Sequence, residues 1–177
     1  MHKPFIYHIL DIANYQEIHR ELSAHALAQV AACQGRFNHI NLADLLAACP
    51  LLAQWFNTQA LTPRIAALIL FPPGSDQEGT HTDSESDYLA LNWGLANLEA
   101  TWTAFYRLRS GNPVIKTQPL GRPWQHYPSA DLEEIGRVNL VKPTVINAGV
   151  PHCVHNPTGD TRISMSFRFD RNPWHLV

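Results

Sequence analysis

Residues 144–169, TVINAGVPHCVHNPTGDTRISMSFRF, contain two short apolar segments separated by turn-forming residues. Thr144–Ala148 and Arg162–Phe169 are rich in residues that favour β-strands, and Gly, Pro and Asn cluster between them. Because successive side chains of a strand point to opposite faces, Arg162 and Ser164 are expected on one face, and Arg168 has a similar claim to it. The stretch therefore predicts neighbouring strands with no helix between them.

The same pattern of short apolar segments between turn-forming residues extends back to residue 63. Four further segments are short, apolar and bounded by Gly, Pro, Asn or Ser: Arg64–Phe71, Tyr88–Leu95, Thr101–Arg109 and Pro113–Thr117. Six or more short strands without intervening helices predict an antiparallel sandwich or barrel over residues 63–170.

The first third of the chain has a helical pattern. Apolar residues at spacings of three and four predict one helix over Asn14–Phe37, ended by Gly35, and a second over Leu42–Thr58. Asn41 can cap the second helix, and Pro50 should kink or divide it. We therefore expect an α+β fold, mainly β, in a single domain over residues 1–177, in which residues 1–62 form a helical support.

Composition restricts the class of protein. The chain has 177 residues, 45% of them hydrophobic, and a net charge of −2 with scattered Lys and Arg, so neither nucleic acid nor an anionic membrane is an expected partner. Cys33, Cys49 and Cys153 form no Cys-x-x-Cys pair, which argues against a disulfide framework. The first residues lack the pattern of a secretory signal, and we predict a cytoplasmic protein.

Three side chains point to metal chemistry. His81-x-Asp83 follows the strand expected at Arg64–Phe71, and His152 follows the one at Thr144–Ala148. Two imidazoles and one carboxylate can occupy one face of an octahedral ion and leave three positions open, as in non-haem Fe(II) oxygenases. Arg162, on the last expected strand, adds a cation that suits a carboxylate.

His81-x-Asp83, His152 and Arg162-x-Ser164, in this order on a β-rich chain, resemble the Fe(II)- and 2-oxoglutarate-dependent oxygenases. That family's core is a double-stranded β-helix, also called a jelly roll and shared with cupin-like proteins. The resemblance implies that His81, Asp83 and His152 hold Fe(II). It also implies that 2-oxoglutarate pairs with Arg162, helped by Ser164 and, as weaker candidates, by residues of an earlier strand, Asn92 and Tyr88.

The resemblance covers roughly residues 63–170. Its PPG, GTHTD and PHCVHNPTGDTRISMSFRF segments are similar in cadence to the aspartyl/asparaginyl β-hydroxylase-like branch. That branch typically lacks the iron-binding carboxylate, whereas Asp83 is present here. The wider family is therefore better supported than the branch.

Some assignments stay open. His155 competes with His152 as third ligand, although their three-residue offset places them on opposite faces of a regular strand. Cys153 should point away from the metal. Leu120–Pro128 is either a lid over the substrate or a packed loop. The substrate is expected near the following side chains: Trp93, Trp124 and Arg107.

The expected reaction is hydroxylation of a C–H bond in a small molecule or peptide side chain, with O₂ consumed and succinate and CO₂ released. One alternative is a cupin-type dioxygenase or isomerase that does not use 2-oxoglutarate, because Gly149-x-x-His152-x-x-x-Asn156 fits the second cupin motif in part. Another is a non-catalytic jelly-roll module that binds a peptide or sugar. The sequence leaves the substrate and the oligomeric state open.

Overall fold

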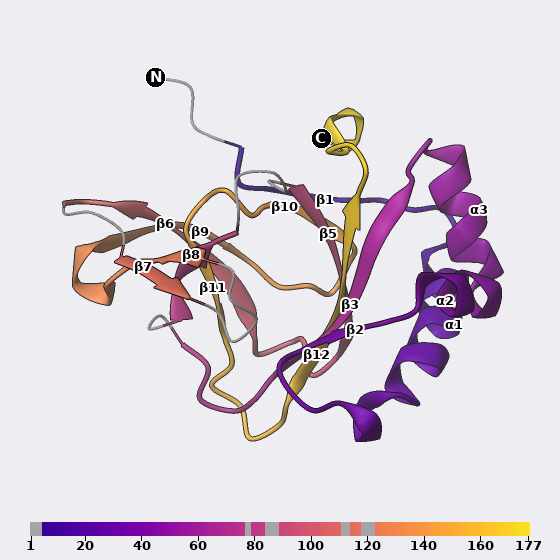
Figure 1. Cartoon of the computed structure of the whole chain (residues 1–177), viewed down its shortest axis with the longest axis horizontal. Coiled ribbons are helices and arrows are strands. Elements are labelled where there is room, and N and C mark those ends of the chain that lie inside the picture. Colours follow the sequence, from indigo (N-terminus) through magenta and orange to yellow (C-terminus); the bar gives the residue numbers. More distant parts are fainter. Residues whose placement is uncertain (1–4, 77–78, 84–88, 111–113, 118–122) are drawn as a thin grey trace.

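The computed structural model describes residues 5–76, 79–83, 89–110, 114–117 and 123–177. Its strands form two six-stranded antiparallel sheets that face each other, with a layer of helices outside one of them (Figure 1). Most consecutive strands from residue 63 onward alternate between the sheets, as in a double-stranded β-helix. The expected mainly β, jelly-roll fold class is confirmed.

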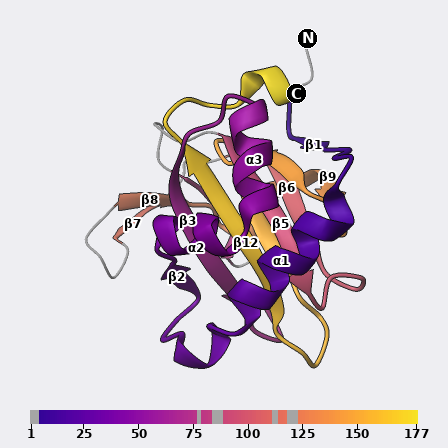
Figure 2. The ribbon, with the colours of Figure 1, turned by 90° about the vertical axis from the view of Figure 1, so that its right-hand side faces the viewer.

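The first sheet carries the helices (Figure 2). In spatial order it contains β1 (Tyr7–Ile9), β10 (Thr144–Asn147), β5 (Leu89–Ala96), β12 (Arg162–Phe169), β3 (Pro63–Phe71) and β2 (Phe37–His39). The second sheet contains β7 (Val114–Thr117), β8 (Pro123–His126), β4 (His81–Thr82), β11 (His152–His155), β6 (Trp102–Leu108) and β9 (Leu132–Val138).

The helices α1 (Tyr15–Leu27), α2 (Leu42–Ala48) and α3 (Pro50–Thr58) cover the outer face of the first sheet (Figure 2). Single 3₁₀ turns lie at Val30–Ala32, Ser129–Asp131 and Trp174–Leu176. The main core lies between the helices and the sheet, where Ile18, Leu22, Leu52 and Phe56 are buried against strand residues such as Phe167. None of the helices in the described ranges is long and apolar enough to span a membrane.

Strand β12 decides which side chains face the other sheet. It pairs with β3 on one side and β5 on the other, so its register is specified from both edges. Met165, Phe167 and Phe169 pack into the core under the helices. The alternate residues Arg162, Ser164, Ser166 and Arg168 then face the second sheet and line the cavity between the sheets.

The division of the second helix is confirmed. Asn41 accepts hydrogen bonds from the backbone N–H groups of Ala43 and Asp44, and α2 ends just before Cys49. Pro50 begins α3, where its missing N–H costs no helical hydrogen bond.

The prediction of one helix over Asn14–Phe37 is wrong beyond Leu27. The chain leaves the helix layer there, and Phe37–His39 pairs as β2 with Ala67–Ile69 of β3. Pairing with a sheet edge overrides the local helical pattern, because it supplies hydrogen bonds that a helix at this position would not share with the sheet.

Candidate metal centre

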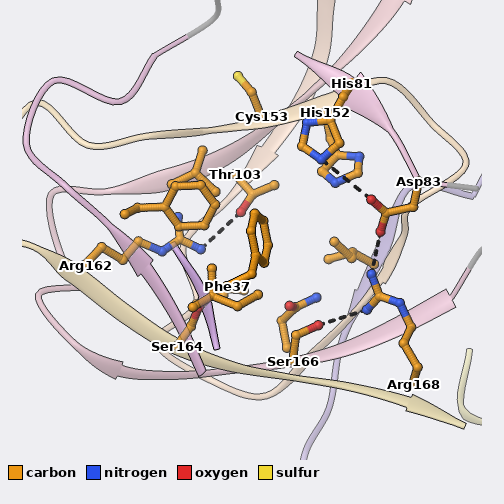
Figure 3. Close-up of a pocket in the computed structure, with 16 residues that line it drawn as sticks. Phe37, His81, Asp83, Thr103, His152, Cys153, Arg162, Ser164, Ser166 and Arg168 are labelled. Atoms are coloured by element: carbon orange, nitrogen blue, oxygen red, sulfur yellow. Dashed lines mark hydrogen bonds and ion pairs between the residues drawn. The ribbon is translucent and has the colours of Figure 1, made fainter. Parts of the chain in front are cut away.

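His81 and His152 come together through strand pairing. They lie directly opposite each other on the antiparallel strands β4 and β11, and their ring centroids are 4.8 Å apart. Asp83, two residues after His81, points to the same side, and its backbone N–H donates to the carbonyl oxygen of Ala148. The ligand atoms of His81, Asp83 and His152 all lie within 4.8 Å of one another (Figure 3). This group could hold a metal ion.

Backbone carbonyls set the tautomer of both imidazoles. Nδ1 of His81 lies 2.8 Å from the carbonyl oxygen of Gly79, and Nδ1 of His152 lies 2.9 Å from that of Val150. Because a carbonyl oxygen only accepts, both Nδ1 atoms carry the hydrogen. The lone pair of each neutral ring is then on Nε2, as metal coordination through Nε2 requires.

The charges of the group also suit a metal. Burial, together with the neighbouring His81, lowers the pKa of His152 to about 4, so His152 is neutral at neutral pH. Burial works to raise the pKa of Asp83, but its electrostatic interactions with Arg168, His152 and His81 outweigh burial and keep the pKa below its usual value. Neutral imidazoles and a carboxylate are the protonation states in which these residues bind metals.

Arg162 lies at the other end of the cavity as a buried cation with unused donors. It is 1% exposed, its Nη2 donates to Oγ1 of Thr103 at 3.1 Å, and its guanidinium lies 6.0 Å from the ring centre of Phe71. Nε and Nη1 have no hydrogen-bond partner within the described part of the chain. Burial lowers its pKa to about 10, which still leaves it charged at neutral pH. A buried cation with free donors is costly, so an anion is the natural occupant of this end.

The remaining predicted contacts divide into those the structure describes and one that it does not. Ser164 and Asn92 are both buried and line the cavity with Arg162. Tyr88 lies outside the described residues. Asn92 is opposite Ser166 in the pairing of β5 with β12, which places its amide on the same wall.

His155 and Cys153 lie on the opposite face of β11 from His152. His155 stacks on Trp102 with ring centroids 5.0 Å apart, and its Nε2 is 2.7 Å from the hydroxyl of Tyr106. Cys153 packs in a separate apolar cluster with Tyr106 and points away from the cavity (Figure 3). The geometry thus brings His152, and not His155, next to His81 and Asp83.

Arg168 and Ser166 are functional candidates to which the sequence analysis assigned no role. Nη2 of Arg168 donates to Oδ2 of Asp83, and Nη1 donates to Oγ of Ser166 at 2.8 Å. The alternation of RISMSFRF was a signal that both face inward. It could not show that Arg168 reaches Asp83, which lies far away in the sequence.

The prediction that the substrate lies near Trp93, Trp124 and Arg107 is wrong for Trp93 and Arg107. Trp93 is fully buried on the other face of the first sheet, where it stacks on Tyr15 of α1. Arg107 is largely exposed and paired with Glu133 rather than directed into the cavity. Trp93 lies on the face of β5 opposite to Asn92 and the cavity, whereas Arg107 lies near the exposed end of β6. The side chain of Trp124 is outside the described part.

The segment Leu120–Pro128 is described only in part. Residues 120–122 lie outside the described residues, Pro123–His126 form β8, and Tyr127 is buried with its hydroxyl donating to Gln125. Apolar side chains also line part of the cavity, and they include Ile146, Leu140 and Val154.

Comparison with known proteins identifies the fold. No family model matches the chain, and no curated protein sequence matches it. Among solved structures, the epimerase SnoN in complex with Fe³⁺, alpha ketoglutarate and nogalamycin RO is similar with a TM-score of 0.56 and 16% identity, over 92% of this chain and 78% of that one. The non-heme alpha ketoglutarate dependent carbocyclase SnoK is similar with a TM-score of 0.52 and 12% identity, over 92% and 79%. The chain therefore has the fold of these alpha ketoglutarate dependent enzymes.

Proposed function

We propose that this protein is an Fe(II)- and 2-oxoglutarate-dependent oxygenase, with residues 1–177 as one catalytic domain working in the cytoplasm. The observation that carries the proposal is the pairing of two unlike sites in one cavity. A His, Asp, His group of ligand atoms lies near one end, and a buried arginine with two unused donors lies at the other. A metal and a carboxylate-bearing co-substrate fit these two sites together.

The residues fit Fe(II) by the chemistry of their donors. Two neutral imidazoles and one carboxylate form the ligand set of non-haem Fe(II) oxygenases, which leaves positions for other ligands. His81, Asp83 and His152 would hold the ion, with both imidazoles oriented by backbone carbonyls. When bound, the iron supplies the reaction of O₂ with 2-oxoglutarate that releases succinate and CO₂ and oxidises the substrate.

The wall formed by β12 and β5 would bind 2-oxoglutarate. Arg162 would pair with its distal carboxylate through guanidinium donors that are otherwise without partners. Thr103 fixes the guanidinium from the other side. Ser164 would donate a further hydrogen bond to that carboxylate, and the Asn92 amide would bind the co-substrate nearer the metal.

The substrate is proposed to be a small molecule or a peptide side chain whose reacting carbon lies against the apolar part of the cavity lining. The side chains of Ile146, Leu140 and Val154 would exclude water from the reacting carbon. We propose hydroxylation as the outcome. SnoN and SnoK are described as an epimerase and a carbocyclase. For this reason the mass of the product, one oxygen heavier than the substrate, is the test of hydroxylation.

Anaerobic titration of the purified protein with Fe(II) and 2-oxoglutarate tests the function. The oxygenase is expected to show a weak visible charge-transfer band only when both are present. Iron binding without that band would replace the proposal with a cupin-type metalloprotein, and no iron binding would replace it with a binding module. Arg162→Met is the matched control, because it should abolish the band and keep iron binding.

A further inference from the structure

We propose that Arg168 is a positioning residue that holds the Asp83 carboxylate in the orientation needed to bind the metal. The inference rests on the proposed function, because it concerns the ligand set assigned there. It adds Arg168, with Ser166 behind it, to the residues on which metal binding depends.

The two oxygens of Asp83 have different neighbours. Oδ2 accepts from Nη2 of Arg168, whereas Oδ1 lies 3.6 Å from Nε2 of His81 (Figure 3). The carboxylate thus turns one oxygen toward the imidazoles while the other is held by the guanidinium. Such an arrangement presents a single oxygen to a metal, because the second one is already hydrogen-bonded.

Arg168 is itself fixed from two directions. Its Nη1 donates to Oγ of Ser166 on the same face of β12, and its side chain is only 17% exposed. β12 lies inside the first sheet with partners on both edges, which makes it a rigid support. Asp83, by contrast, follows the two-residue strand β4. The Arg168 guanidinium therefore connects Asp83, which follows the short strand β4, to the rigid strand β12 in the first sheet.

If Arg168 acted only through its charge, its removal would strengthen metal binding, whereas a positioning role predicts that its removal weakens it. A guanidinium beside a metal site repels the incoming cation, so removing it should tighten metal binding if Arg168 acted only through its charge. A positioning role predicts weaker binding, because the freed carboxylate has to be ordered when the metal binds. The sign of the change in affinity separates the two roles.

The two arginines of β12 have different tasks in this scheme. Arg162 has unused donors and no carboxylate partner among the described residues, whereas Arg168 is paired with Asp83. A free anion such as 2-oxoglutarate therefore finds its vacant donors at Arg162. Substitution of the two arginines should affect different affinities.

The experiment is an anaerobic titration of the whole protein with Co(II), followed by its visible bands, without 2-oxoglutarate. Arg168→Met should weaken Co(II) binding about 10–100-fold, the range seen when an outer-shell partner of a metal ligand is lost. Arg168→Lys keeps the charge but loses the planar fork, and should fall between wild type and Arg168→Met. Ser166→Ala should weaken binding a few-fold in the same direction.

Control variants separate a loss of metal binding from a loss of 2-oxoglutarate binding and from misfolding. Arg162→Met should keep the Co(II) affinity and lose 2-oxoglutarate affinity, whereas Arg168→Met, at saturating Co(II), should keep 2-oxoglutarate affinity within about threefold. Arg107→Met, an exposed arginine outside the cavity, should change neither. Circular dichroism of each apo variant checks the fold, and if Arg168→Met does not fold, Arg168→Lys and Ser166→Ala carry the test.

Equal or tighter Co(II) binding by folded Arg168→Met would overturn the positioning role. So would a selective loss of 2-oxoglutarate or substrate affinity, which would make Arg168 an anion-binding residue instead. If the wild-type protein itself fails to bind Co(II), the proposed function fails. If wild type and Arg168→Met both bind Co(II) with the same affinity, only the positioning role fails.

Discussion

His81 and His152 are direct neighbours across the antiparallel pair β4 and β11, although much of the jelly roll separates them in the sequence. The pairing brings the ring centroids of the two imidazoles to within 4.8 Å of each other. Each ring is oriented by a carbonyl two residues before it in its own strand connection. The candidate metal centre is therefore built from sheet register and local turns together.

Removal of a proposed ligand should abolish metal binding with little effect on the fold. His81→Ala and Asp83→Ala each delete a donor atom at a partly exposed position, so the apo protein should keep its secondary structure. The loss of Fe(II) affinity should exceed the about 10–100-fold that an outer-shell partner costs. Isothermal titration under anaerobic conditions measures it. His155→Ala, on the other face of β11, should bind normally, and weakened binding there would contradict the assignment of His152.

Arg162→Met should stabilise the apo protein and impair the enzyme. The substitution removes a buried cation with two unpartnered donors and keeps an unbranched apolar stem, for an expected gain of about 1–3 kcal/mol in the free energy of unfolding. The 2-oxoglutarate requirement should rise about 100-fold, because charge-assisted hydrogen bonds to the carboxylate are lost. Urea unfolding and succinate release measure the two effects. A less stable apo variant would show that the cation already has a partner.

Stability should fall at mildly acidic pH because of His19. Nε1 of Trp93 donates to Nδ1 of His19 at 3.2 Å, and burial lowers the pKa of His19 below its ordinary value of 6.5. The unfolded chain then takes up a proton more readily than the folded one, so this contribution is fully present above pH 6.5 and is lost as the pH falls below it.

Comparison with His19→Asn isolates that contribution from the other histidines. Asparagine offers an acceptor that does not titrate, so its free energy of unfolding should change less between pH 7.5 and about pH 5 than that of wild type. Chemical denaturation at several pH values gives the two curves. Parallel curves would remove His19 as the cause.

Gly94→Ala should destabilise the first sheet. A Cβ at Gly94 would lie 2.2 Å from the backbone oxygen of Leu140, which cannot move aside as a flexible side chain can. Overpacking of this kind costs about 1–3 kcal/mol. Thermal unfolding compares it with Gly159→Ala, whose Cβ would meet nothing within 4 Å. An unchanged melting temperature for Gly94→Ala would show that the two segments separate freely.

Local patterns in the sequence carried much of the fold and part of the candidate site. Strand β12 was visible because Met165, Phe167 and Phe169 alternate with Arg162, Ser164 and Arg168, and alternation depends only on the two-residue period of a strand. The division of the helix at Pro50 was visible because proline has no N–H to donate. His81-x-Asp83 likewise indicated two of the candidate metal ligands.

Other features had no local signal, because they depend on which strands meet and in what register. The pairing of β2 with β3 ended the first helix early, and the packing of α1 on Trp93 turned that side chain away from the cavity. The contact between Arg168 and Asp83 joins two sheets.

The sequence by itself determined the periodicities and the chemical types of the candidate ligands. The tertiary structure alone decided which of them share a cavity, because contacts between distant segments are set by packing rather than by local conformational preference.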